Sequence, residues 1–260
     1  MGSILVPVAV LAFSSAILAQ TTTQSGAAKA LTAAPTLDLS GVWSQHPPVT
    51  SRRFAIYSFT GEIPPMTPWG EARYKAAKPS FGPLAVPNST DLVNPTTGKD
   101  VGCFPPGVPR IYVHPYPMEI IQIPGRVIML FEFDHFVRQI YTDGRQHPHD
   151  LAPTWMGDSI GRWEGDTLVV DTIGFNDKTW LDRAGLPHSD GLHVVERIRR
   201  VEHNILEVNI TIDDPKAYTK PWEGRLIFQL KPDWKIMEFI CEDNVTFLDL
   251  QKKAIEEPAK

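Results

Sequence analysis

The sequence lacks the motifs that mark several large classes of protein. It contains no P-loop, no Gly-x-Gly-x-x-Gly and no His-Glu-x-x-His. The first two absences argue against a kinase and a nicotinamide-dependent enzyme. Metal-ligand side chains occur at His147, His149, His188 and His193, but Pro148 places the first pair in a loop and no metal signature supports them. We therefore expect neither a metal nor another cofactor.

An excess of basic residues is also missing. The net charge is −5 and the pI about 5.9, which argues against a nucleic-acid partner. After the first 18 residues, no apolar run approaches the length of about 18 residues that a membrane span needs. We therefore expect small molecules, rather than nucleic acid or membrane, as partners, and the sequence makes no prediction of the oligomeric state.

The N-terminus predicts secretion. Residues 4–18 are apolar and lead to Ala19, so residues 1–19 are typical of a signal peptide and residues 20–36 of a disordered lead-in. In an oxidising compartment the two cysteines, Cys103 and Cys241, most simply form one disulfide, the alternative being two buried thiols. Three glycosylation sequons, at Asn88, Asn209 and Asn244, agree with a secreted chain.

Residues 37–115 hold many of the 24 prolines and predict a wrap or lid over a folded body. Within this segment, Pro68 to Ala77 predicts a short helix, with Thr67 as its N-cap and Pro68 in its first turn. The remainder is expected to be loop and extended chain.

Residues 116–250 predict an all-β domain that forms one structural unit with the wrap. About nine short apolar runs, the last being residues 235–242, alternate with turn signals such as Pro124-Gly125 and Glu164-Gly165. This pattern favours an antiparallel up-and-down, lipocalin-like β-barrel with room for one small ligand. Alternation places Leu206, Val208, Ile210 and Ile212 on the inner face and Asn209 on the outer face.

Ionisable residues that interrupt apolar strands are the candidate catalytic groups. Asp171 and Glu196 stand in mid-strand, Asp158 precedes a strand, and His135 follows the apolar face of Val127, Met129, Phe131 and Phe133. A carboxylate in an apolar barrel, or a histidine at its mouth, could act as an acid or a base. The alternative for His135 is a core histidine with a backbone partner.

Large aromatic residues near polar loops are the candidate ligand contacts, because they offer wide stacking surfaces. We expect the substrate-binding residues to be Phe131, Phe133, Trp155, Trp163, Asn176 and Trp180. Asn176 and Trp180 follow a strand in a loop that strand propensity does not require, and they are expected at the rim of a pocket. The alternative is that the tryptophans serve only as core plugs.

The segment TWMGDSIGRWEGDTLVVDTIGFNDKTWLD, together with CFPPGVPR and FICEDN, resembles a family of secreted proteins of mostly unknown function. With its leader and sequons, the chain also resembles the secreted fungal hetero-Diels–Alderases of tropolone sesquiterpenoid biosynthesis. This resemblance implies a cofactor-independent cycloaddition between a tropolone quinone methide and an apolar terpene such as humulene. It carries over no catalytic residue. The alternatives are a lipocalin-like carrier of apolar molecules and a secreted hydrolase.

Overall fold

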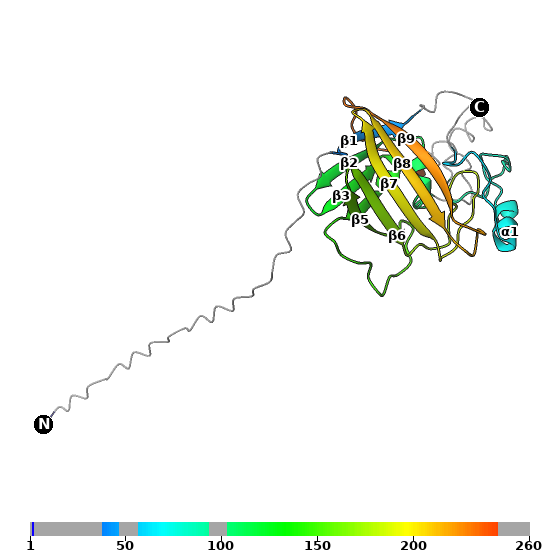
Figure 1. Ribbon diagram of the computed structural model, residues 1–260, viewed down its shortest axis with the longest axis horizontal. Helices are drawn as coiled ribbons and strands as arrows, with labels where there is room; N and C mark the ends of the chain where they lie inside the picture. The colour runs from blue at the N-terminus through cyan, green and yellow to red at the C-terminus, as the bar shows by residue number, and fades with distance from the viewer. Residues whose placement is uncertain (1, 3–37, 47–56, 94–102, 244–260) are drawn as a thin grey trace. The chain divides into compact units, whose positions relative to one another are not determined.

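Nine β-strands close into one barrel in the computed structural model (Figure 1). The strands follow chain order around the barrel, and the last pairs with the first. This confirms the predicted all-β barrel. The strands are β1 (Gly41–Gln45), β2 (Met118–Ile123), β3 (Arg126–Phe131), β4 (Val137–Tyr141), β5 (Asp158–Glu164), β6 (Thr167–Ile173), β7 (His193–Glu202), β8 (Ile205–Asp213) and β9 (Trp222–Leu230).

The structure describes residues 2, 38–46, 57–93 and 103–243. The predicted signal peptide (residues 1–19), the lead-in (residues 20–36) and the sequon at Asn244 lie outside these residues. Apart from Gly2, the described residues belong to one compact unit. No helix among them is long and apolar enough to cross a membrane.

One pair of neighbouring strands, β4 and β5, is parallel, whereas the other eight pairs are antiparallel. The expectation of a wholly antiparallel barrel is therefore corrected at this pair. The reason is geometric, because a closed ring with an odd number of strands cannot alternate direction all the way round. Residues 142–157 link the two parallel strands, and such a link must return along the barrel from one end to the other.

The ninth strand is not the one that the sequence pattern indicated. Residues 235–242 form no strand, and β1 completes the barrel instead, from within the segment that we expected to be a wrap. β1 pairs with β2 through Val42↔Glu119 and with β9 through Ser44↔Gln229. A five-residue strand with Gly at its start carries a weak periodic signal. The described part of residues 37–115 therefore contributes a strand to the barrel.

The barrel interior follows the predicted alternation. Leu206, Val208, Ile210 and Ile212 of β8 are fully buried, and Val127, Met129 and Phe131 of β3 are buried as well. Phe133 does not continue this face, because β3 ends at Phe131 and the chain turns into the 3₁₀ helix η2 (Phe133–His135).

The predicted short helix is α1 (Pro68–Ala76), and Thr67 is its N-cap. The Thr67 hydroxyl accepts a hydrogen bond from the Gly70 amide at 3.1 Å and donates one to the Lys216 carbonyl at 2.6 Å. The cap therefore also fastens α1 to the β8–β9 connection. After α1, the wrap forms another 3₁₀ helix, η1 (Arg110–Val113), and then enters β2.

The two sequons in the described residues occupy different surroundings. Asn88 is exposed in the wrap. Asn209 lies on β8 between the buried residues Val208 and Ile210, on the outer face as expected, and its amide donates to Glu207 at 2.8 Å. Both positions agree with the expected glycosylation but do not test it.

Cys103 and Cys241 form the predicted disulfide, across a sequence separation of 138 residues. Beside it, Phe239 stacks on Phe133 with ring centroids 5.4 Å apart, and Val93 completes a small second core. Residues 235–242 thus lie over η2, where the Asp134 amide donates to the Phe239 carbonyl at 3.1 Å.

We predict that the double variant Cys103→Ser/Cys241→Ser loses about 2–5 kcal/mol of unfolding free energy, because its unfolded chain is no longer restricted by a long closed loop. Urea unfolding followed by circular dichroism measures this loss. Reduced wild type should match the variant, and the variant should not respond to the reductant. Equal midpoints for oxidised wild type and variant would contradict the prediction.

Candidate functional site

The barrel interior is occupied by a side chain from the wrap. Tyr112 of η1 is buried, with its ring 5.9 Å from that of Phe131 on β3 and 6.0 Å from that of Phe228 on β9. Its hydroxyl donates to Glu196 Oε1 at 2.8 Å. The structure therefore corrects the expectation of a ligand-sized hollow at this level of the barrel, because Tyr112 acts as a plug.

Glu196 is paired with Arg138 in the same interior. Arg138 Nη1 donates to Glu196 Oε1 at 2.9 Å, and Arg138 Nη2 donates to Oε2. Both side chains are at most 2% exposed. We expected Glu196 to be a catalytic carboxylate, but both of its oxygens accept hydrogen bonds from Arg138 or Tyr112. This is the geometry of a structural ion pair.

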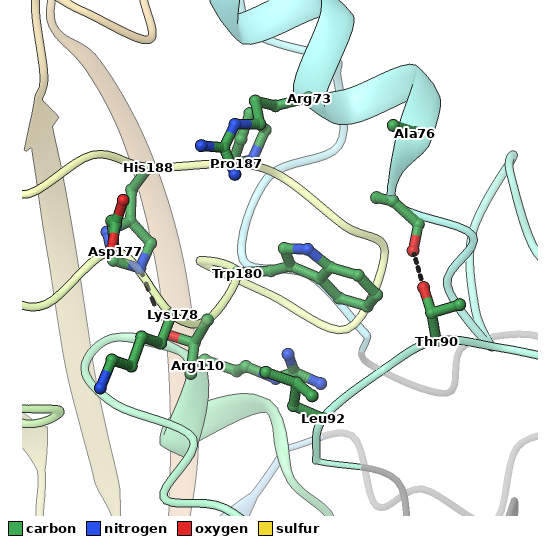
Figure 2. Close-up of a pocket in the computed structure, with 12 residues that line it drawn as sticks. Arg73, Ala76, Thr90, Leu92, Arg110, Asp177, Lys178, Trp180, Pro187 and His188 are labelled. Carbon is green, nitrogen blue, oxygen red and sulfur yellow. Dashed lines mark hydrogen bonds between the residues drawn. The ribbon is translucent and has the colours of Figure 1, made fainter. Parts of the chain in front are cut away.

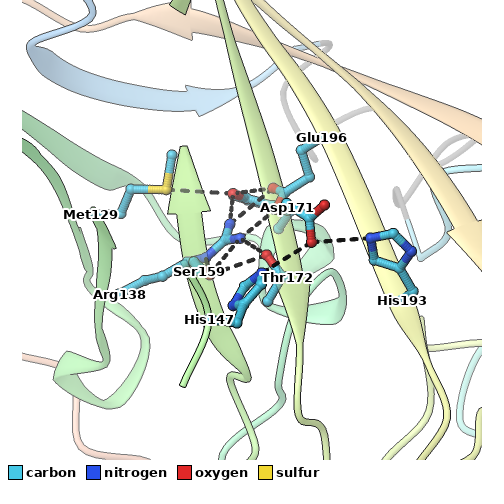
Figure 3. Close-up of polar contacts among 9 residues, drawn as sticks. Met129, Arg138, His147, Ser159, Asp171, Thr172, His193 and Glu196 are labelled. Atoms are coloured by element: carbon cyan, nitrogen blue, oxygen red, sulfur yellow. Dashed lines mark hydrogen bonds and ion pairs between the residues drawn. The ribbon is translucent and has the colours of Figure 1, made fainter. Parts of the chain in front are cut away.

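The remaining donors of Arg138 are satisfied by hydroxyl groups. Its Nη2 donates to Thr172 Oγ1 at 3.0 Å and its Nε to Ser159 Oγ at 3.2 Å, so strands β4, β5, β6 and β7 meet in one network (Figure 3). Burial raises the pKa of Tyr112 well above its usual value, which keeps its hydroxyl a donor. Burial opposes the charge of Arg138, but Glu196 and Tyr112 together outweigh this effect and raise the pKa of Arg138 overall.

Ser159 also lies in a stretch, Gly157 to Gly161, that has the spacing of the serine-hydrolase motif Gly-x-Ser-x-Gly. In that motif the serine sits on a sharp turn between a strand and a helix, exposed for attack. Here Ser159 is buried within β5 and bonded to Arg138. The spacing therefore carries no nucleophile at this position.

A pocket of about 320 Å³ lies where the wrap meets the loop between β6 and β7. We call it the rim pocket. Figure 2 shows the Trp180 ring between Arg73 of α1 on one side and Arg110 and Leu92 on the other. Its lining residues are Arg73, Ala76, Ala77, Thr90, Leu92, Arg110, Asp177, Lys178, Thr179, Trp180, Pro187 and His188.

The β6–β7 loop holds Trp180 in place through a local fold of its own. Trp180 forms an isolated bridge with Pro187, and the Leu181 amide donates to the Leu186 carbonyl at 2.7 Å. Asp182 Oδ1 accepts hydrogen bonds from the amides of Ala184 and Leu186. Asp and Asn commonly stabilise turns in this way. The acidic residues that follow β6 thus include one that builds the loop.

Arg110 is the buried charge of the rim pocket. It is 1% exposed, and its Nη2 donates to Asp91 at 2.5 Å. Its guanidinium carbon lies 5.4 Å from the centroid of the Trp180 ring. Arg110 begins η1, the same short helix that carries Tyr112 into the barrel, so one short helix links the interior network and the pocket.

His188 lines the opposite side of the pocket. Its Nδ1 lies 3.0 Å from the Ser189 carbonyl, and its Nε2 lies 3.2 Å from the Thr179 hydroxyl. A carbonyl only accepts, so Nδ1 carries the proton and Nε2 accepts from Thr179 in the neutral ring. Burial lowers the pKa of His188, which favours this neutral form.

A second polar cluster, which we call the outer cluster, lies apart from the barrel interior. His147 of the β4–β5 loop contacts Asp158 Oδ1 through Nδ1 at 2.7 Å and Asp171 Oδ1 through Nε2 at 3.1 Å. His193 Nε2 lies 3.1 Å from the same Asp171 oxygen (Figure 3). His147 thus contacts a carboxylate oxygen through each of its two ring nitrogens.

The outer cluster fastens the β4–β5 loop to the barrel. Asp158 and Asp171 were expected to be catalytic, but the structure places them beside His147 rather than in the rim pocket. Within the part of the chain that the structure describes, no group of three or more His, Cys, Asp and Glu side chains is arranged to hold a metal.

The other expected site residues are dispersed. His135 is exposed on η2, and Phe133 belongs to the second core. Trp155 stacks on Phe104 at 5.7 Å, and Trp163 packs against the main core. Asn176 makes a turn, accepting from the Lys178 amide at 3.2 Å.

Among the expected ligand contacts, the rim pocket therefore contains Trp180. Sequence reasoning missed Arg110, Arg138 and Tyr112. Arg138 carried a usable signal, since it alternates with Ile140 on one strand face as Glu196 does with Ile198.

We predict that Glu196→Gln costs about 3–5 kcal/mol of unfolding free energy, because it leaves Arg138 buried without its counter-ion. Thermal or urea unfolding measures the cost. Glu164→Gln, which removes an outer-wall partner of Arg197, is the matched control and should barely move the midpoint. The double variant Arg138→Met/Glu196→Leu should recover much of the loss. Equal midpoints for Glu196→Gln and the control would contradict the structural role.

We predict that His147→Gln loosens the β4–β5 loop, because glutamine cannot contact both Asp158 and Asp171 in the same geometry. Hydrogen–deuterium exchange of residues 143–153 should become faster. His149→Gln, which changes an exposed histidine in the same loop, should leave exchange unaltered. If both variants exchange like the wild type, the outer cluster does not fasten the loop.

No protein-family model matches this chain, and no curated protein matches it either.

Proposed function

We propose that the protein is a cofactor-independent cyclase. It joins a tropolone quinone methide to an apolar, humulene-like terpene by an intermolecular hetero-Diels–Alder reaction, and the tropolone partner binds in the rim pocket. The chemistry comes from the sequence resemblance described above. The observation that carries the proposal is the pairing of the Trp180 ring with the buried guanidinium of Arg110 in one cavity.

The size of the rim pocket suits one reactant. Ligand sites span about 300–1,000 Å³, and a cavity of about 320 Å³ is at the lower end of that range. A tropolone-sized ring can stack on Trp180 within it, while a larger terpene is expected at the open side, next to the small residue Ala76. The exposed position of Ala76 is compatible with such a second reactant.

The reaction needs little from the protein beyond placement and polarisation. The oxygen–carbon diene of the quinone methide adds to one alkene bond, forming one carbon–oxygen and one carbon–carbon bond, and no atom leaves. Holding both partners in a reactive pose can contribute about 7–11 kcal/mol. A hydrogen bond from Arg110 to the tropolone oxygen would stabilise the negative charge that develops there.

The alternatives differ in what they require of the pocket. A carrier of apolar molecules would bind both reactants without changing the rate of their union. A hydrolase using Asp158 and Asp171 finds less support, because His147 occupies an oxygen of each carboxylate. For both the cyclase and the carrier, we propose that the small molecules bind in the rim pocket.

We predict that the purified protein accelerates adduct formation from humulene and a tropolone alcohol, which loses water to give the quinone methide, and that it yields one stereoisomer. Chiral chromatography against an enzyme-free reaction measures both. Trp180→Ala should slow the reaction about tenfold through lost stacking, without loss of fold. Trp234→Ala, an exposed tryptophan outside the pocket lining, is the control.

Adduct that forms at the enzyme-free rate and with the enzyme-free stereochemistry would refute the cyclase proposal. If the protein nevertheless binds the tropolone precursor, and Trp180→Ala weakens that binding, the carrier alternative is supported.

A further inference from the structure

Two arginines repel each other near the rim pocket, Arg110, which is buried, and Arg183, which is half-buried. Arg110 is paired with one carboxylate, Asp91, and its buried Nε has no hydrogen-bond partner. Arg183 stacks on Phe81, its guanidinium carbon 3.8 Å from the ring centroid. Among residues 57–93 and 103–243, no carboxylate forms an ion pair with Arg183. Burial and then repulsion from Arg110 lower the pKa of Arg183 to about 10, so it still carries its charge at neutral pH.

The neighbouring ionisable groups do not supply the missing negative charge. Asp182 is fully buried, and burial raises its pKa, which weakens it as a counter-ion. Burial, with Arg183 and Arg110 adding to it, lowers the pKa of His114 well below its usual value, so this ring stays neutral. In the described part of the chain, Arg110 forms its ion pair with Asp91, and Arg183 forms none.

A buried donor without an acceptor costs about 1–3 kcal/mol, so the unpaired Nε of Arg110 marks a place where an acceptor would be stabilising. Arg110 lines the rim pocket, and Trp180 lies over its guanidinium. The apolar side chains of Leu92 and Ala77 complete this part of the wall. The site combines a positive hydrogen-bond donor with flat and apolar surfaces.

We propose that the inner end of the rim pocket is an oxyanion site. It binds a planar conjugated ligand through a negatively charged oxygen, as in an aromatic carboxylate, a phenolate or an enolate. Arg110 donates to that oxygen, and Arg183 adds positive potential without touching the ligand. The inference rests on the proposed function only in taking the rim pocket as the ligand site, and it deepens that function by stating the charge of the bound form.

Benzoate and benzamide form the probe pair, because they share size and shape but differ in charge. We expect wild-type protein to bind benzoate at least about tenfold more tightly than benzamide, as a charge-assisted hydrogen bond predicts. Isothermal titration calorimetry at pH 7 and low salt measures both. Equal affinities would overturn the oxyanion site. The absence of benzoate binding at concentrations up to about 1 mM, which is about 1,000 times a micromolar Kd, would overturn it as well.

The variant Arg110→Gln/Asp91→Asn makes both members of the buried ion pair neutral, so neither charge is left buried without its counter-ion. It should fold, as judged by circular dichroism, and lose the preference for benzoate. Arg197→Gln/Glu164→Gln removes a matched arginine–carboxylate pair from the outer wall and should keep the preference. A folded Arg110→Gln/Asp91→Asn protein that still prefers benzoate would also overturn the site.

The outcome is separable from that of the cyclase assay. Charge-selective binding without adduct formation would uphold the oxyanion site and refute the cyclase. Adduct formation without charge-selective binding would support the cyclase and refute the oxyanion site.

Discussion

The buried ion pair between Arg138 and Glu196, completed by the Tyr112 hydroxyl, is the constraint on which the rest of the structure depends. Each partner would be costly to bury alone, so the three groups stabilise the fold only as a set. Because Arg138 is on β4, Glu196 on β7 and Tyr112 on η1, the network fixes the wrap against two walls of the barrel. It also explains why a barrel of nine strands contains a plug at the place where a ligand was expected.

The plug moves the candidate site from the barrel axis to its rim. Tyr112 and Arg110 are two residues apart on η1, so anchoring one in the interior positions the other beside Trp180. The opposite side of the pocket comes from the β6–β7 loop, which Asp182 and the Trp180–Pro187 bridge hold in shape. A site made by two such supported segments can hold a guanidinium in a fixed direction, which electrostatic catalysis requires.

The sequence predicted the local features of the fold well and the long-range features poorly. Alternation identified eight of the nine strands, and the cap at Thr67 identified α1, because both signals depend on neighbouring residues. β1 escaped because its pairing with β2 and β9 is decided far along the chain. Glu196 was recognised as unusual, but its partner Arg138 lies 58 residues away. No local pattern shows that a carboxylate in a strand has a buried arginine opposite it.

The choice of candidate site residues depended on local pattern in the same way. His135, Asp158 and Asp171 were selected as ionisable groups near apolar runs, yet an exposed turn and a loop-fastening cluster satisfy them. Such residues differ from Arg110 in one physical respect, since their polar atoms find partners or water. The Arg110 Nε is buried and has no hydrogen-bond partner among the described residues. A candidate ligand contact in this barrel is therefore distinguished from a structural charge by a polar atom that lacks a hydrogen-bond partner beside a cavity. Ionisable character alone does not make this distinction.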